Sequence, residues 1–162
     1  MDGCLREMRV TGIKNEDTMK LLNTVFVVML LSFAMPGYGQ GIEKKKFNFS
    51  KSGEDGIGYT QAIKAGNTIY ISGIAARGPM NEAIKKIYDR LAKVLAYYDA
   101  TLENVVKETA YTTALDDLIA SQDLRKEYYK GDYPASSWVE IKRLYAPDAI
   151  LEIEFVAVLK GQ

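Results

Sequence analysis

The side chains available for chemistry in this sequence are carboxylates, hydroxyls and arginines, because the chain has no histidine and only one cysteine, Cys4. Histidine is the commonest general base and the commonest metal ligand, so its absence removes the commonest candidate for each role. A single cysteine excludes an internal disulfide and, without histidine, a zinc site built on these residue types. Glu152 and Glu154 are two residues apart and share one face of a strand, where paired carboxylates can split their pKa values.

A β-hairpin and a helix are predicted to lead the folded part of the chain. The run 68–72 is β-branched and aromatic, the run 59–63 precedes it, and the residues between them include Gly66 and Asn67, which favour a turn. Asn81 is a suitable N-cap, and apolar residues recur at helical spacing from there to Tyr98. This pattern predicts one amphipathic helix that covers a sheet.

The second half of the chain predicts a strand, a helix and two further strands. The strand spans 105–115, the helix begins at Asp116 or Asp117 and runs to about Lys130, and the strands span 137–144 and 150–159. The resulting order, ββαβαββ, is typical of an α+β fold in which two helices pack on one face of a mixed sheet. In the last strand both faces carry apolar residues, so we expect oligomerisation to cover the helix-free face.

Length and charge limit the number of domains and the kind of partner. At 162 residues the chain is long enough for one domain, and its acidic and basic side chains balance at 21 each. No global field attracts nucleic acid, and none is predicted as a partner.

The N-terminal part is typical of a secretory signal peptide. Lys20 follows Met19, an apolar run spans 21–34, and small residues occupy the −3 and −1 positions if cleavage follows Gly39. The run is shorter than the ~20 residues that span a bilayer, so we expect no stable membrane anchor. The alternative is a buried or membrane-lying helix of a cytoplasmic protein. We predict a non-native or disordered leader at 1–18, a signal peptide at 19–39, a linker at 40–55 and the domain at 56–160, in a periplasmic or secreted protein.

Several segments from residue 56 onward form a recognisable series. The segments are Gly58-Tyr59-Thr60-Gln61-Ala62, Ile69-Tyr70-Ile71-Ser72-Gly73, Val105-Val106-Lys107-Glu108-Thr109 with Leu115-Asp116-Asp117-Leu118, Pro134-Ala135-Ser136-Ser137-Trp138-Val139-Glu140, and Leu151-Glu152-Ile153-Glu154-Phe155-Val156-Ala157. Each segment is weak alone, but their order and spacing together are specific and cover nearly all of the domain. In these segments the chain resembles the Rid (YjgF) family of reactive-intermediate deaminases.

The resemblance implies a homotrimer with a small-molecule cleft between neighbouring subunits and no metal or organic cofactor. Active members of the family hydrolyse imines and enamines of amino acids, such as 2-aminoacrylate, to 2-keto acids and ammonia. Glu152 matches the glutamate that positions the attacking water, and Tyr59 matches a cleft tyrosine. By the same resemblance Ser72, Gly73, Ser136, Ser137 and Trp138 are the candidate substrate-binding residues. A solvated or intersubunit charge is the alternative role for Glu152, and a salt bridge across the trimer is the role expected of Glu154.

The sequence departs from the family at the arginine that grips the substrate carboxylate, where it has Ser136. A hydroxyl donates one neutral hydrogen bond, whereas a guanidinium supplies charge and a two-pronged fork. Trp138, two residues on, either fills the pocket or forms a stacking wall. Arg77, Arg125 or Arg143 could replace the missing cation, and Arg77 is the best placed because it follows the Ser-Gly strand end.

Three functions remain open from the sequence. The first is an exported Rid-like binder of a small metabolite without classical deaminase activity. The second is an imine or enamine deaminase of altered specificity in which Glu152 activates water. The third is a structural or interaction protein whose vestigial pocket is filled by Trp138.

Overall fold

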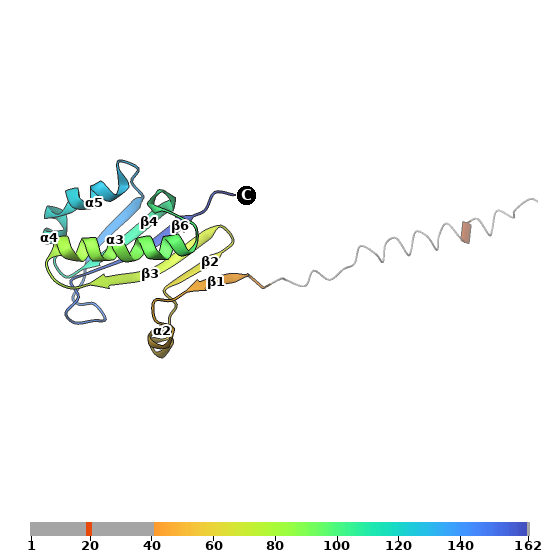
Figure 1. Ribbon diagram of the computed structural model, residues 1–162, viewed down its shortest axis with the longest axis horizontal. Helices are drawn as coiled ribbons and strands as arrows, with labels where there is room; N and C mark the ends of the chain where they lie inside the picture. The colour runs from red at the N-terminus through yellow and green to blue at the C-terminus, as the bar shows by residue number, and fades with distance from the viewer. Residues whose placement is uncertain (1–18, 21–40, 162) are drawn as a thin grey trace, which may run out of the picture. The chain divides into compact units, whose positions relative to one another are not determined.

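The computed structural model describes residues 19–20 and 41–161 of the chain (Figure 1). The chain divides into two units, Met1–Gly41 and Ile42–Gln162, and the second holds all the helices and strands named below. The leader predicted at 1–18 and nearly all of the signal peptide predicted at 19–39 lie outside the described residues. Among the described helices, none has the length and apolar character needed to cross a bilayer.

The described domain is built on a six-stranded sheet with the order β1-β2-β3-β6-β4-β5. All neighbouring strands are antiparallel except β4 and β5, which are parallel. Five of the strands correspond to those predicted, although β5 ends earlier than expected. The strands are β1 (Lys44–Phe47), β2 (Ala62–Ala65), β3 (Thr68–Ala76), β4 (Val105–Thr112), β5 (Ala135–Glu140) and β6 (Leu151–Val158).

The helices α3 (Met80–Tyr97), α4 (Leu115–Ala120) and α5 (Gln122–Tyr129) lie together on one face of this sheet (Figure 1). This arrangement confirms the predicted α+β architecture. The second predicted helix is present as two short ones, α4 and α5, which meet at Ser121, where the backbone (φ −97°, ψ 8°) departs from helical values.

The core forms where the apolar stripe of α3 meets the inward face of the sheet. The alternation predicted for the last strand holds in β6, because Leu151, Ile153, Phe155 and Ala157 are at most 2 % exposed. On α3 the buried side chains recur at helical spacing, with Ile87 and Leu91 at its centre. The side chains of β6 that alternate with the core are half-buried or exposed on the opposite face.

The segment 40–55, predicted to be a linker, is from Ile42 onward part of the folded domain. It carries β1, which pairs with β2 and adds an edge strand, and most of α2 (Lys51–Ile57). The Glu54 carboxylate, 4 % exposed, accepts hydrogen bonds from the backbone N–H groups of Phe49, Ser50 and Gln61 and thereby ties α2 to the start of β2. Burial favours the neutral form, but these bonds and one from Asn48 outweigh it, so the pKa of Glu54 is lowered. The lysines of β1 point to solvent, which is why the sequence resembles a hydrophilic leader.

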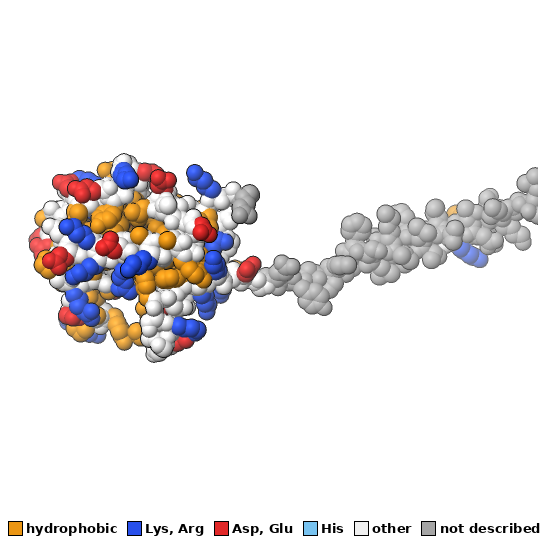
Figure 2. Space-filling view, viewed as in Figure 1, with side chains coloured by type: hydrophobic (Ala, Val, Ile, Leu, Met, Phe, Trp, Pro, Cys, Tyr) orange, Lys and Arg blue, Asp and Glu red, His pale blue; other side chains and the backbone are white. Residues whose placement is uncertain are grey.

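Lysine and arginine side chains alternate with acidic ones on the face that carries α3 and α5 (Figure 2). This mixture agrees with the formal net charge of zero and leaves no continuous basic track on that face.

Candidate functional site

A β-bulge in β3 creates the site. The pairing of β3 with β6 shifts register between Ile71 and Ile74, so Ser72 and Gly73 bulge from the ladder. The pairing of β2 with β3 ends at Ile71, whereas β3 continues to Ala76. The backbone edge of β3 beyond the bulge is therefore not paired by β2.

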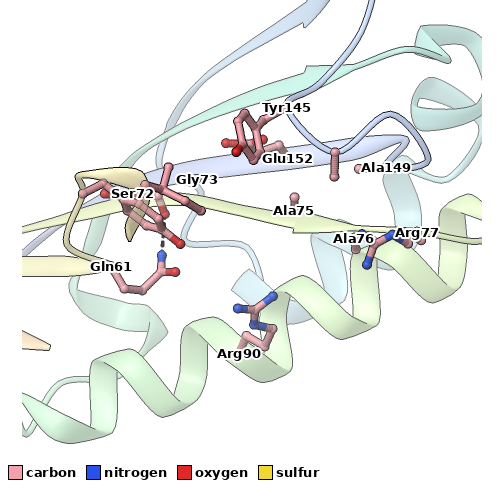
Figure 3. A pocket seen from close by; sticks show the side chains of 13 residues that line it. Gln61, Ser72, Gly73, Ala75, Ala76, Arg77, Arg90, Tyr145, Ala149 and Glu152 are labelled. Atoms are coloured by element: carbon pink, nitrogen blue, oxygen red, sulfur yellow. Dashed lines mark hydrogen bonds between the residues drawn. The ribbon is translucent and has the colours of Figure 1, made fainter. Parts of the chain in front are cut away.

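A pocket of about 490 Å³ lies along this unpaired edge (Figure 3). Its volume falls within the usual range of small-molecule sites. The wall is formed by β3, by α3, by the end of α2 with the chain after it, by β6 and by the loop that precedes β6. The lining residues are Ile57, Tyr59, Gln61, Ser72, Gly73, Ala75, Ala76, Arg77, Arg90, Tyr145, Ala146, Ala149 and Glu152.

Glu152 is the carboxylate of this pocket and lies against Gly73. A β-carbon built on Gly73 would be 1.8 Å from Oε1 of Glu152, so only glycine leaves room for the carboxylate in this position. Burial, and to a smaller extent the charge of Glu154 on the same face of β6, raise the pKa of Glu152. A half-buried carboxylate with a raised pKa is suited to exchange a proton with a bound molecule or water.

The residues around the bulge hold one another in place. Gln61 Nε2 donates to the carbonyl oxygen of Ser72 at 2.9 Å (Figure 3). The Ser72 hydroxyl donates to the carbonyl oxygen of Thr60 at 2.8 Å. The Ser72 hydroxyl hydrogen is thus engaged within the fold. Tyr59 is 39 % exposed in the pocket, and burial, followed by the charge of Glu54, raises its pKa.

Two arginines line the pocket, and they differ in their partners. Arg77 forms an ion pair with Asp148 of the loop before β6, and both side chains are largely exposed. Arg90 rises from α3 toward the open edge of β3 (Figure 3), and its guanidinium stacks over the ring of Phe49 at 4.5 Å from the centroid. Within the described part of the chain Arg90 makes no ion pair or hydrogen bond.

Ser136 lies outside this pocket, as an exposed residue of β5 at the edge of a buried polar cluster. The buried members of the cluster are Glu108, Arg125, Tyr88 and Tyr129. The Ser136 hydroxyl donates to Oε1 of Glu108 at 2.7 Å, and the same oxygen accepts from Nε and a terminal nitrogen of Arg125 at 2.5 Å. Oε2 of Glu108 accepts from the hydroxyls of Tyr129 at 2.8 Å and Tyr88 at 3.0 Å. Glu108 is fully buried, yet each of its oxygens is satisfied.

The Glu108 carboxylate shifts the pKa values of the groups around it. Burial disfavours the charged guanidinium of Arg125, but the Glu108 carboxylate more than offsets it, so the pKa of Arg125 is raised. Burial and the charge of Glu108 together raise the pKa of Tyr88 and of Tyr129, which therefore stay neutral donors.

The two neighbours of Ser136 in the candidate set also lie away from the pocket within one chain. Trp138 shares the strand face of Ser136, as the strand period predicts, and its Nε1 donates to the Ser136 hydroxyl at 2.9 Å. The Arg125 guanidinium lies 5.5 Å from the centre of the indole. Ser137 points to the opposite face, where its hydroxyl accepts from Lys107 Nζ at 2.9 Å.

The structure thus gathers Tyr59, Ser72, Gly73 and Glu152 at one pocket and places the β5 residues elsewhere. Sequence reasoning missed Arg90 and Tyr145, which also line the pocket. Arg90 is a charged residue between the apolar positions of α3, a pattern that carries no functional signal, and Tyr145 lies in an irregular loop that no motif marks. No described residues form a group of three or more His, Cys, Asp or Glu placed to hold a metal ion.

Comparison with known proteins identifies relatives of this chain. The family model described as Endoribonuclease L-PSP matches residues 55–159. A RutC family protein from Pyrococcus abyssi is 31 % identical over 123 residues, which cover 70 % of this chain and 96 % of that protein. A protein named 2-iminobutanoate/2-iminopropanoate deaminase from Dermatophagoides farinae is 28 % identical over 111 residues, which cover 63 % of this chain and 86 % of that protein.

Solved structures share the fold. The crystal structure of a member of the YjgF/YER057c/UK114 family from Mycobacterium tuberculosis superposes with a TM-score of 0.67 at 23 % identity, covering 72 % of this chain and all of that one. A protein from Thermotoga maritima, described as a putative endoribonuclease, superposes with a TM-score of 0.61 at 25 % identity, covering 75 % of this chain and 98 % of that one.

Proposed function

Because this chain belongs to the Endoribonuclease L-PSP family, which includes the RidA/YjgF proteins, we propose that it binds a small organic molecule in the pocket at the β3 bulge and has little activity on 2-aminoacrylate. One observation carries the proposal: the position of the family's substrate-binding arginine is Ser136, whose hydroxyl is bonded to the buried carboxylate of Glu108. The pocket itself, with Glu152 and Tyr59 on its wall, is present and open.

A pocket that is retained while the arginine of β5 is missing favours ligand binding over the hydrolysis of 2-imino acids that is usual in the family. A charge-assisted bond to a carboxylate is about twice as strong as a neutral one, so its loss from β5 weakens the hold on a 2-imino acid in the orientation that the arginine imposes. Within one chain the indole of Trp138 packs beside Arg125, which does not support a pocket plugged by that side chain.

The test compares hydrolysis and binding in one preparation. 2-Aminoacrylate is generated in situ, ammonia release is followed, and an arginine-bearing relative serves as the positive control. We expect at least tenfold slower release than in the relative, together with saturable binding of small keto acids or ketones seen by NMR. Ammonia release equal to that of the relative would overturn the proposed lack of activity, and a pocket that binds none of the compounds would overturn the binding role.

An imine hydrolase of altered specificity is the second candidate, and the raised pKa of Glu152 favours it. In this reaction the oxygen of water adds to the imine carbon, a proton passes through the Glu152 carboxylate to nitrogen, and ammonia leaves as the carbonyl forms. Imines without a carboxylate are the substrates to screen. A Glu152→Gln variant that retains the full rate would exclude this role.

Three copies of the chain are proposed to assemble, so that the edge strand β5 of a neighbouring copy closes the pocket. Support comes from the exposed side of the sheet, where Tyr70 is 55 % exposed and Val158 40 % exposed. Light scattering should report the mass of a trimer. Tyr70→Lys should lower that mass, whereas Ile119→Lys, a matched change of an exposed apolar residue on α4, should not. A wild-type monomer would contradict the assembly.

Export is proposed from the organisation of residues 19–39 and is tested at the N-terminus. Sequencing of the protein isolated from its native cell should begin near Gln40. A chain that begins at Met1 would count against export.

A further inference from the structure

We infer that Arg90 of α3 binds the carboxylate of the molecule held in this pocket, in place of the arginine that β5 lacks. The inference rests on the proposed binding function and adds the chemical class of the ligand, a small monocarboxylate. The carboxylate would then be held from the helix layer of the same chain, by Arg90, and not from strand β5.

The first argument compares the cations near the two relevant positions. Arg77 is engaged by Asp148, and Arg125 is engaged by Glu108 in a cluster outside the pocket. Arg90 lines the pocket and has no anionic partner among the described residues. Of the three, it is the guanidinium whose fork is available to an anion that enters the pocket.

The second argument concerns the position of the Arg90 side chain. Its guanidinium stacks over the ring of Phe49, and the chain around Phe49 is tied down by the hydrogen bond from the Phe49 N–H to Glu54 at 2.8 Å. Packing over an aromatic face restricts the side chain but leaves the N–H donors, which lie in the plane of the guanidinium group, free to bind an anion. The segment that contains β1 and α2 thus supports the arginine.

The third argument is the polarity of the pocket. Arg90 lies on the helix side of β3, and Glu152 lies on the other side of that strand, with the unpaired edge of β3 between them (Figure 3). A ligand along this edge can place a carboxylate at Arg90 and a carbonyl or imine group near Glu152. A monoanion matches the single unpaired guanidinium, whereas a phosphate dianion would leave excess negative charge beside Glu152.

The test is an NMR titration of the full-length protein with three probes: 2-oxobutanoate, the neutral ketone 2-butanone and inorganic phosphate. The variants are Arg90→Gln, Arg90→Lys and Arg77→Gln, the last at the other arginine of the pocket. The matched control is Lys93→Gln, at an exposed cation of α3 outside the pocket lining. We expect Arg90→Gln to weaken 2-oxobutanoate binding at least tenfold, because a charge-assisted bond is lost, and to leave 2-butanone binding unchanged. The affinity of Arg90→Lys for 2-oxobutanoate should lie between those of wild type and Arg90→Gln. Arg77→Gln should have a smaller effect than Arg90→Gln, and Lys93→Gln should change 2-oxobutanoate binding less than twofold.

Each other outcome would overturn a different part of the proposal. If 2-oxobutanoate binds equally to wild type and Arg90→Gln, or if Arg77→Gln has the larger effect, Arg90 is not the anchor and the binding function stands. If phosphate binds more tightly than 2-oxobutanoate, the ligand class is wrong. If no probe binds, the inference and the binding function both fail. Thermal unfolding checks that each variant is folded. If Arg90→Gln is unfolded, the binding of 2-oxobutanoate to Arg90→Lys tests the inference instead, because lysine keeps the charge but lacks the two-pronged guanidinium.

Discussion

The Glu152 carboxylate occupies the space that a β-carbon on Gly73 would fill, with Oε1 at 1.8 Å, Cδ at 2.6 Å and Cγ at 2.7 Å from that position. These two residues come from neighbouring strands, β3 and β6, and meet at the bulge. Position 73 therefore cannot gain a side chain unless the Glu152 carboxylate moves.

Gly73→Ala is expected to displace the Glu152 carboxylate without removing it. The methyl group cannot share the space, so the glutamate side chain must rotate toward solvent, and ligand binding should weaken while the fold is kept. Gly56→Ala is the control, since a β-carbon there meets nothing within 4 Å. Binding of 2-oxobutanoate and thermal unfolding are measured for both. Unchanged binding in Gly73→Ala would contradict a role for the placed carboxylate.

The raised pKa of Glu152 predicts how stability depends on pH. A carboxyl group whose pKa is higher in the folded state stabilises the fold when protonated, and this contribution is lost as pH rises from about 4.3, its unfolded value, through the folded pKa. Glu152→Gln lacks this loss, so it should be more stable than wild type at pH 7, with the excess shrinking toward pH 4.

Denaturant unfolding of Glu152→Gln and wild type at several pH values measures that difference. Because the charge of Glu154 is the second cause of the shift, the stability gap at pH 7 between glutamate and glutamine at position 152 should be smaller when Glu154→Gln is also present. A stability gap of constant size from pH 4 to pH 7 would refute the raised pKa.

Removal of Arg125 should be costly, because it leaves the buried carboxylate of Glu108 without its cation. Breaking a buried pair in this way typically costs about 3–5 kcal/mol, so we expect a loss of that order for Arg125→Met in urea unfolding. Glu108→Gln combined with Arg125→Met removes both charges and should recover a large part of the loss. Two single changes that simply add, without recovery, would show that the pair is not coupled.

Ser136→Arg alone is not expected to create activity on 2-aminoacrylate. The new guanidinium would meet the oxygen of Glu108 that Arg125 already occupies, so two cations would compete for one carboxylate and stability should fall. Ammonia release and thermal unfolding are the readouts, with Ser137→Arg on the opposite face as the control. A large gain in activity from Ser136→Arg would mean that β5 can reach the pocket with its partners unchanged.

The spacing of apolar residues predicted most helices and strands of the domain, because each of these elements buries one face and so repeats apolar residues at its own period. The alternation from Leu151 to Ala157 and the helical spacing from Ile84 to Leu95 mark buried faces, and each appears in the structure as predicted. The segment with β1 and α2 was missed, since an edge strand of lysines has the composition of a solvated leader and gains its structure by pairing with β2.

The sequence by itself determined the fold class, the family and the replacement of the family's arginine by Ser136, because these depend on residue type and spacing along the chain. Only the tertiary structure decided what surrounds the pocket. In the fold Ser136 is hydrogen-bonded to Glu108, and Arg77 is paired with Asp148. Arg90 lies in the same pocket as Glu152, although its helix is distant in sequence from β6. Charge pairing depends on distances of a few ångströms between segments far apart in the chain, and local sequence patterns carry no information about such distances.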